Sequence, residues 1–228
     1  MLRIDLYTEI TCPWCIVGQH RLDKVLAERF PELAVDIHHH PVLLLPDAPT
    51  SGLYIPDLLR IRYGITDPKV AFARPEAEAR ASGLPLDLGR QPMAYPTQAA
   101  HALILAARER STQHRLAVAI TNAYFIDAKN IGSADVLADI ASGHGFEYAE
   151  ARAIALDPAE YRRVEQEAAN SAVEGVRSVP HFILGGRIAI NGGRSEDEIA
   201  CSLQEAARFI ASNRVEHGQL FWRGATYE

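Results

Sequence analysis

Two cysteines separated by two residues are the side chains of this sequence whose chemistry is most readily assigned. They open and close the tetrad Cys12-Pro13-Trp14-Cys15. A cysteine thiolate is the nucleophile of disulfide exchange, and a second thiol within reach can complete the exchange by closing an intramolecular disulfide. The tetrad therefore predicts redox chemistry at Cys12 and Cys15. Pro13 and Trp14 add an uncharged, apolar surface beside the two sulfurs.

The segments on either side of the tetrad predict that it begins a helix. Apolar and polar residues alternate over residues 2–7, which is typical of a strand, and apolar residues then recur at helical spacing over 22–30. Cys12 would thus lie at the helix N-terminus, with Pro13 at the first helical position. The helix dipole and the unpaired N–H groups favour a thiolate at Cys12. Cys15 follows one turn later, within disulfide distance.

Two other interpretations of the cysteines stay open at this point. A zinc site usually takes four ligands, and the chain has three cysteines without a second Cys-x-x-Cys. His38, His39 and His40 are further potential ligands, but neighbouring residues at the end of a strand point alternately to its two faces. We therefore expect no metal site. A pair of unreactive cysteines is the second alternative to redox chemistry.

The composition bounds the class of protein. The chain has 228 residues, 48% of them hydrophobic, and a formal net charge of −6. This length suits one large domain or a domain that carries an insertion. The mildly acidic balance predicts neither a nucleic-acid partner nor an anionic membrane partner, and no apolar run has the length of a membrane span. The start lacks a signal-peptide pattern and three cysteines suit a reducing compartment, so we expect a cytoplasmic protein.

The order of the expected elements indicates an α/β fold with a large helical insertion. A second strand over 33–38 completes a βαβ unit beside the tetrad, a combination typical of thioredoxin-like redox proteins. Near the C-terminus, a hairpin turning at Gly185-Gly186 precedes a helix that starts in a capping box, Ser195 to Glu198. We predict a thioredoxin-like domain from residues 1–44 and 156–213, a helical insertion at 45–155, and a C-terminal tail at 214–228.

Cap residues delimit most of the expected helices. The predicted N-caps are Asp67, Thr97, Ser133 and Asp157. The helices after the last three are expected to end near residues 109, 142 and 172, a further helix spans 114–126, and the last helix covers 199–212. The tail beyond it has no clear period. It packs either on the domain or on a second subunit of a homodimer, and both alternatives stay open.

A proline beside the C-terminal hairpin is the second candidate part of the site. Val179-Pro180-His181 directly precedes that hairpin. An X-Pro bond tolerates the cis form far better than other peptide bonds, although most X-Pro bonds are trans. Because the tetrad and the βαβ–ββα order accompany it, we expect the Val179–Pro180 bond to be cis.

Several stretches of the sequence resemble the DsbA-like thioredoxin superfamily, and most closely its FrnE-like, cytosolic branch with a helical insertion. They are residues 12–18, 179–182 and 185–192, together with residues 124–138, which resemble the helical region of that branch. The resemblance extends over nearly the whole chain to about residue 212. It implies a thioredoxin fold without a tightly bound cofactor, acting on a protein or small-molecule thiol or disulfide.

The resemblance also implies roles for the candidate residues. Cys12 would be the attacking cysteine, Cys15 the resolving one, and cis-Pro180 would lie next to Cys12. The backbone of Val179 would pair with the substrate. The other implied substrate contacts are Pro13, Trp14 and His181. Two positions depart from the branch: Ile16 stands where an aromatic residue is commoner, and His181 where an apolar or aromatic one is commoner. The direction of electron flow therefore stays open.

A neighbouring branch with the same fold suggests a different activity. It comprises the kappa-class glutathione transferases and the 2-hydroxychromene-2-carboxylate isomerases, in which a serine-type residue replaces the first cysteine. Gly193, Arg194 and Ser195 would form an anion-binding helix start for glutathione in such a protein. Simple helix capping is the interpretation we favour for these three residues. Glutathione as co-substrate stays an alternative.

Three further residues are weaker candidates. Cys201 lies at an apolar position of the last helix, where a buried, inert thiol is expected. His20 is expected to be a solvated helical residue, with proton transfer as the alternative. Glu9 is expected to be a loop carboxylate, although a carboxylate so near the tetrad could relay protons or raise a thiol pKa.

The sequence favours a thiol–disulfide oxidoreductase that uses Cys12 and Cys15. A glutathione-dependent transferase or isomerase acting on a small aromatic substrate is the second hypothesis. A non-catalytic module that binds a metal or a partner through the helical insertion is the third.

Overall fold

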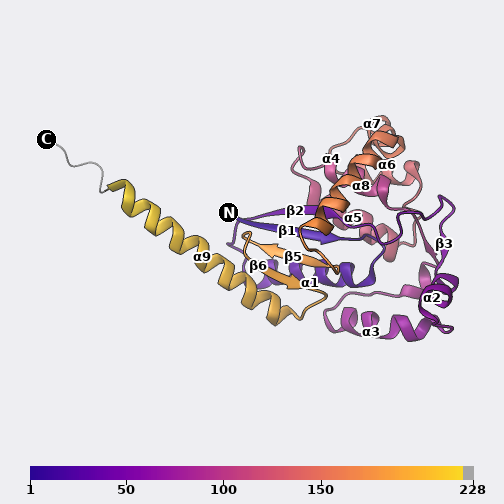
Figure 1. Ribbon diagram of the computed structural model, residues 1–228, viewed down its shortest axis with the longest axis horizontal. Helices are drawn as coiled ribbons and strands as arrows, with labels where there is room; N and C mark the ends of the chain where they lie inside the picture. Colours follow the sequence, from indigo (N-terminus) through magenta and orange to yellow (C-terminus); the bar gives the residue numbers. More distant parts are fainter. Residues whose placement is uncertain (223–228) are drawn as a thin grey trace.

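A four-stranded mixed sheet forms the centre of the protein in the computed structural model (Figure 1). The structure describes the backbone of residues 1–222 and the side chains of residues 1–210 and 212. The strands are β1 (Leu2–Thr8), β2 (Val35–Pro41), β5 (His181–Leu184) and β6 (Ile188–Asn191), in the spatial order β2-β1-β5-β6. Strand β1 pairs in parallel with β2, whereas β5 is antiparallel to both β1 and β6. The expected βαβ and ββ pairings are thus confirmed.

One face of this sheet is covered by the helix that carries the tetrad and by the last helix of the chain. These are α1 (Pro13–Arg29) and α9 (Glu196–Trp222), which contact each other below the sheet in Figure 1. Their apolar faces and the alternating apolar residues of β1 form one buried cluster, which includes Leu2, Ile4, Leu6, Leu22, Val25, Phe182, Ile199 and Leu203. This core is thus formed by one face of the strands, where every second residue is apolar, and by the apolar faces of the two helices, where apolar residues recur about every 3.6 residues.

The opposite face of the sheet is covered by helices from the middle of the chain. Helices α4 (Gln98–Ala106), α5 (Gln113–Phe125) and α8 (Pro158–Val173) all contact β2. Helices α6 (Ala134–Ser142) and α7 (Tyr148–Leu156) complete this layer, which lies above the sheet in Figure 1. The predicted α/β thioredoxin architecture is confirmed: a mixed sheet between two helical layers.

Two further helices lie beside the N-terminal end of α1 (Figure 1). They are α2 (Ile55–Tyr63) and α3 (Pro68–Ala81), accompanied by the short 3-10 helix η1 (Leu88–Arg90) and a two-stranded ribbon of β3 (Leu53–Tyr54) and β4 (Met93–Ala94). The largest buried cluster of the protein lies in this helical region and also includes Ile10, Ile16 and Val17. The tip of α1 therefore shares its core with the helices of the middle segment.

The predicted caps are mostly confirmed. The side chains of Asp67, Ser133 and Asp157 accept N-cap hydrogen bonds, and Ser195 with Glu198 forms the capping box. Thr97 is the N-cap residue of α4 as predicted, but its side chain makes no capping hydrogen bond, because its hydroxyl donates to the Glu9 carboxylate instead.

Several helix boundaries differ from the predicted ones. Helix α4 ends at Ala106, three residues before the predicted end, and the sequence patterns missed α7 altogether. Helix α9 continues to Trp222, well past the predicted end at residue 212. Residues 223–228 of the predicted tail lie outside the described residues. The division of the chain into an interrupted thioredoxin-like domain, an insertion and a tail stays a prediction.

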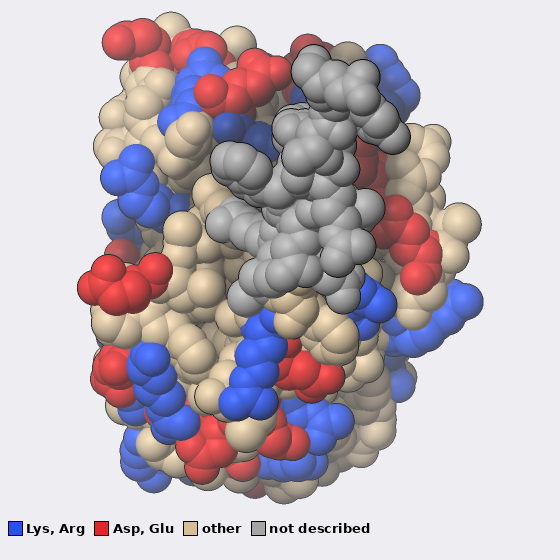
Figure 2. Space-filling model, turned by 90° about the vertical axis from the view of Figure 1, so that its left-hand side faces the viewer, with Lys and Arg blue, Asp and Glu red and all other residues tan. Residues whose placement is uncertain are grey.

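The surface shown in Figure 2 carries both signs of charge, with Lys and Arg interspersed among Asp and Glu. None of the helices formed by the described residues combines the length and the apolar character that crossing a bilayer requires.

Candidate active site

Cys12 and Cys15 lie at the N-terminal tip of α1. Cys12 is the N-cap residue, with an extended backbone, and Pro13 occupies the first helical position. The N–H of Cys15 donates to the carbonyl of Cys12 at 2.9 Å, and the N–H of Cys12 donates to the carbonyl of Glu9 at 3.1 Å. Both thiols are free, and their residues are 8% and 2% exposed, respectively. The placement predicted for the tetrad is thus confirmed.

The two thiols differ strongly in acidity. The Cys15 thiol donates a hydrogen bond to the Cys12 sulfur, and this bond, together with the backbone N–H groups of Cys15 and Trp14, lowers the pKa of Cys12. Burial raises the pKa of Cys15 well above its usual value, and the adjacent Cys12 sulfur raises it further. Cys12 is therefore the thiol that ionises first, as required of an attacking nucleophile.

The proline loop rests on α1 one turn beyond Cys15. The Val179–Pro180 peptide bond is cis. The ring of Pro180 lies against Gly18, where a Cβ atom would come within 2.7 Å of Pro180 Cγ and 3.2 Å of Phe182 Cζ. Gly18 therefore allows the loop to approach the helix, because no side chain stands between them. The sequence patterns did not single out Gly18 as a site residue.

Trp14 connects the tetrad to the start of α9. A Cβ atom at Gly193 would come within 2.9 Å of Trp14 Cε3, so the indole packs directly on that glycine. On α3, the guanidinium of Arg74 lies 5.3 Å from the centre of the indole. The predicted helix-start residues are thus brought beside the tetrad.

The groups that would bind an anion at this helix start already have partners. The N–H of Ser195 donates to Glu198 Oε2 at 2.9 Å, and the Ser195 hydroxyl accepts from the N–H of Glu198. Arg194 lies 3.2 Å from Glu198 Oε1. Three carboxylates, those of Glu196, Asp197 and Glu198, occupy the first turn of α9. These contacts favour the capping interpretation over an anion site.

His181 is the first residue of β5. Its Nδ1 lies 2.5 Å from Asn191 Oδ1, and its ring packs edge-on against Tyr7 at 5.6 Å. The residue is buried. These contacts indicate that His181 supports the strand after the proline loop, and its substrate contact stays a prediction.

Glu9 lies in the loop between β1 and α1, as expected, but it is buried. It is 1% exposed and accepts hydrogen bonds from the N–H groups of Thr11 and Leu44 and from the Thr97 hydroxyl. Burial raises its pKa to about 7 despite these three donors. The burial was not predictable because the donors come from segments up to 88 residues away, which local patterns do not reveal.

His101 on α4 is a further buried polar residue of this region. Its Nε2 lies 3.9 Å from Glu9 Oε1 and has no hydrogen-bond partner among the described residues. Burial lowers the pKa of His101 to about 3, so its imidazole is neutral at pH 7. A carboxyl group that titrates near neutrality thus lies beside the tetrad, next to a neutral imidazole.

Comparison with known proteins identifies the family. The model of the DSBA-like thioredoxin domain matches residues 3–204. The chain belongs to this family.

Individual proteins similar to this chain share about a quarter of its residues. The Bacillus subtilis protein YwbO is 24% identical over 202 residues, which cover 86% of this chain and 92% of YwbO. A probable DsbA oxidoreductase from Streptomyces coelicolor superposes with a TM-score of 0.80 at 26% identity, over 90% of each chain.

Two further structures share the fold alone. A 2-hydroxychromene-2-carboxylate isomerase has a TM-score of 0.66 at 15% identity, over 93% of this chain and 98% of its own. The cytosolic disulfide reductase DsbM of Pseudomonas aeruginosa, solved with GSH, has a TM-score of 0.64 at 17% identity, over 90% of this chain and 99% of its own.

Arg21 is a residue of this DSBA-like chain that the sequence patterns missed. It is buried on α1, and its guanidinium donates to the carbonyls of Gly193 and Arg194, to Ser82 Oγ and to the carboxylate of Glu78. It therefore fixes α3 and the start of α9 on the helix that carries the tetrad. A buried arginine in an otherwise apolar helix face is the signal that would have identified it.

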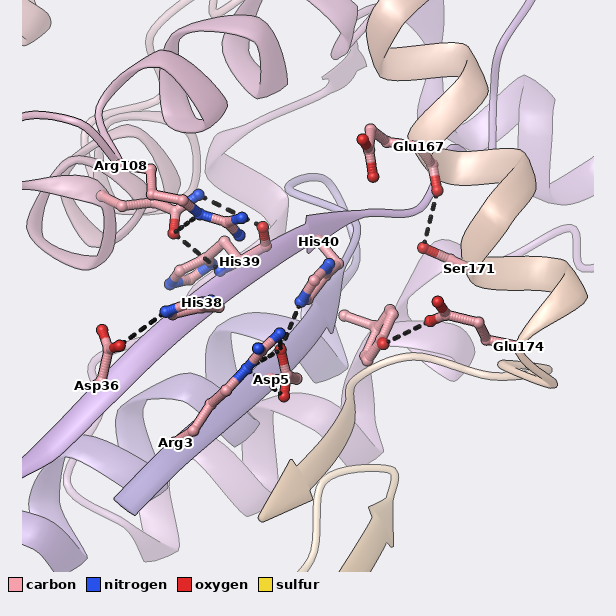
Figure 3. Close-up of polar contacts among 12 residues, drawn as sticks. Arg3, Asp5, Asp36, His38, His39, His40, Arg108, Glu167, Ser171 and Glu174 are labelled. Atoms are coloured by element: carbon pink, nitrogen blue, oxygen red, sulfur yellow. Dashed lines mark hydrogen bonds and ion pairs between the residues drawn. The ribbon is translucent and has the colours of Figure 1, made fainter. Parts of the chain in front are cut away.

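The three consecutive histidines line β2 (Figure 3). His40 contacts Asp5, which also binds Arg3, and His38 contacts Asp36. His39 is buried and lies 2.9 Å from His114. Within the described part of the chain, no three His, Cys, Asp or Glu side chains converge in a group that could hold a metal ion.

One weaker prediction is wrong, and another holds in part. Cys201 is exposed, because Ile199 and Leu203 occupy the face of α9 that packs on the sheet. His20 lies on α1 as predicted, but it is partly buried, and its Nε2 lies 2.9 Å from the carbonyl of Ser82.

Proposed function

We propose that this DSBA-like protein is a thiol–disulfide oxidoreductase. The Cys12 thiolate attacks one sulfur of a substrate disulfide, forms a mixed disulfide and releases the first substrate thiol. Cys15 then loses its proton and attacks the Cys12 sulfur, which closes the Cys12–Cys15 disulfide and releases the second thiol. The substrate gains two electrons from the two cysteine sulfurs; Cys15 supplies one proton, and the second comes from solvent. The oxidised protein carries out the reverse reaction.

The placement of Cys12 at the tip of α1, with the N–H of Cys15 donating to its carbonyl one turn later, is the observation that carries this proposal. The low pKa of Cys12 supports a role as both attacking and leaving sulfur, whereas the high pKa of Cys15 keeps that thiol protonated until it has to resolve the mixed disulfide. The loop of Pro180 on α1 supports the substrate positions at Val179 and Pro180, where a short stretch of substrate backbone would bind.

Cysteine variants test the proposal. Cys12→Ser should abolish reduction of a simple disulfide such as 2-hydroxyethyl disulfide. Cys15→Ser should accumulate a covalent adduct with the substrate, which intact-protein mass spectrometry detects. Cys201→Ser is the matched control and should behave as the wild type. Adducts that form on Cys15 in the Cys12→Ser variant instead would refute the assigned order of attack.

The direction of electron flow requires a separate measurement. The reduction potential of the Cys12–Cys15 pair can be measured by equilibration with glutathione. A potential near about −270 mV would indicate a reductant, and one near about −120 mV an oxidant.

A glutathione-dependent activity is the second candidate, because the fold is shared with a disulfide reductase solved with GSH and with an isomerase. Full activity on a small aromatic substrate in the Cys12→Ser variant, dependent on added glutathione, would favour it. The internal pairing of Arg194 and Ser195 with Glu198 argues against glutathione binding at the start of α9.

A further inference from the structure

An apolar cavity of about 280 Å³ lies beside the attacking cysteine. One wall is the tetrad segment, with Thr11, Cys12 and Pro13. The other walls come from the segment after β2, from α2 and α3, and from the end of α5, and their side chains are mostly apolar, such as those of Leu58 and Phe72. The cavity therefore joins the reactive sulfur to a surface that can bind an organic group.

Helix α2 lines this cavity, but its apolar side chains are not fully buried. None of its nine residues is buried, although Ile55, Leu58 and Leu59 all line the cavity. Around the cavity, Leu44 is 43% exposed and Tyr63 62% exposed. Apolar side chains left half-buried around a cavity would lose further water-exposed area when an apolar ligand enters.

The size of the cavity restricts the ligand. An apolar cavity of about 150 Å³ suffices to bind benzene. A cavity of about 280 Å³ thus has room for one substituted aromatic ring, but not for a folded peptide segment. Glutathione, a tripeptide with two carboxylates and an ammonium group, matches this lining poorly, because the lining is mostly apolar.

The charge of the lining adds a further restriction. Among the described residues that line the cavity, Arg62 is the one with a charged side chain. Arg62 is exposed, and its guanidinium donates to the carbonyl of Leu44 at 3.3 Å and lies 5.9 Å from the ring of Tyr63. A ligand with a carboxylate on its ring would have a cation to pair with.

We propose that this cavity binds the aromatic half of a small aryl disulfide that carries a carboxylate, and that it presents the ligand's sulfur to Cys12. The proposal rests on the function proposed above and adds the substrate class. In the reaction, a bond forms between Cys12 Sγ and the bound aryl sulfur, the aryl disulfide bond breaks, and the other half leaves as an aryl thiolate. Attack by Cys15 then releases the bound half, and dithiothreitol reduces the protein again in an assay.

Cavity-filling variants test the proposal. Ala71→Phe places a ring in the cavity from α3, and Leu58→Trp does so from α2. Ala73→Phe is the matched control, because Ala73 is exposed on the same helix and does not line the cavity. Thermal unfolding establishes that each variant is folded.

Rates of disulfide reduction give the first measurement. The aryl probe is 5,5′-dithiobis(2-nitrobenzoate), and 2-hydroxyethyl disulfide serves as the small aliphatic reference. We expect both filling variants to lower kcat/KM for the aryl probe by about tenfold or more, as overpacking of a site does, with the reference within about twofold. An equal fall for both disulfides, or no fall, would overturn the proposal.

The carboxylate part of the proposal has its own test. Arg62→Gln should lower kcat/KM for 5,5′-dithiobis(2-nitrobenzoate) but not for 4,4′-dithiodipyridine, an aryl disulfide without a carboxylate. An equal effect on both would overturn the assignment of Arg62.

A binding measurement separates this inference from the proposed function. 5-Methylthio-2-nitrobenzoate has the aryl group but no disulfide, and its binding can be followed by calorimetry. Binding that Ala71→Phe weakens, in a protein that reduces no disulfide, would support the cavity and reject the redox function. Disulfide reduction without any binding of this analogue would reject the cavity and retain the function.

Discussion

The carboxylate of Glu9 lies 3.9 Å from the Nε2 atom of His101, and neither residue is more than 2% exposed. The pair joins the segment that leads into Cys12 to helix α4. Because burial raises the pKa of Glu9 to about 7 and lowers that of His101 to about 3, both groups are largely uncharged just below neutrality. We therefore expect the stability of the protein to depend on pH.

Glu9→Gln should remove a pH-dependent part of the stability. In the folded protein Glu9 keeps its proton up to about pH 7, whereas in the unfolded chain it loses the proton near its ordinary value of 4.5. Its contribution is therefore fully present below pH 4.5 and falls by roughly 3 kcal/mol as the pH rises through 7. Urea unfolding from pH 5 to 8 should show a steeper fall in the free energy of unfolding for the wild type than for the variant.

A control separates this effect from a general effect of charge removal. Glu165→Gln removes a carboxylate from the exposed surface of α8 and should follow the wild-type pH dependence. The lowered pKa values of His39 and His101 act in the opposite direction, but they are common to all three proteins. Parallel curves for the wild type and Glu9→Gln would contradict the prediction.

Cys15→Ala should raise the pKa of Cys12, because the Cys15 thiol is the first cause of its lowered value. Cys15→Ser keeps a hydroxyl donor at the same place and should raise the pKa less. The rate of alkylation by iodoacetamide as a function of pH measures this pKa in both variants once Cys201 is replaced by serine. If the two variants titrate together at the wild-type pKa, the hydrogen bond between the thiols has no such effect.

Gly18→Ala should destabilise the protein by about 1–3 kcal/mol, because the new methyl group would lie 2.7 Å from Pro180 Cγ. Disulfide exchange should slow as well, because the proline loop has to move away from α1. Gly143→Ala is a suitable control, since the nearest atom to its Cβ is 3.6 Å away. Equal unfolding free energies for the two variants would show that the Pro180 loop moves away from the new methyl group without loss of stability.

Arg21→Lys should destabilise the protein nearly as much as Arg21→Gln, although lysine keeps the charge. A single ammonium group cannot reach Ser82 Oγ, the Glu78 carboxylate and the carbonyl of Gly193 at once, as the guanidinium does. We expect a loss of about 3 kcal/mol in chemical unfolding for both variants. Recovery of wild-type stability by lysine would show that charge alone matters at this position.

Much of the fold followed from local patterns. The alternation in β1, the cap residues Asp67 and Ser133, and the capping box at Ser195 are short-range signals, and the structure confirms each of them. The position of Cys12 at the tip of α1 was predictable for the same reason, because a proline at the first helical turn fixes where the helix starts.

Features that depend on distant contacts were not predictable in this way. The burial of Glu9 depends on donors from Leu44 and Thr97, and the role of Gly18 depends on Pro180. Cys201 looked buried by residue type, but the rotation of α9 on the sheet exposes it. The cavity beside Cys12 is lined by residues of α2 and α3, and hydrophobic periodicity does not predict where these helices pack.

The core that holds the tip of α1 has a consequence for any attempt to simplify this protein. Ile10, Ile16 and Val17, which flank the two cysteines, pack into the cluster formed by the middle helices, not into the one beneath the sheet. A shortened protein that kept the sheet, α1 and α9 alone would therefore expose these three apolar side chains to water. The middle helices therefore pack directly around the segment that carries Cys12 and Cys15, and a protein designed to keep this segment would need those helices as well.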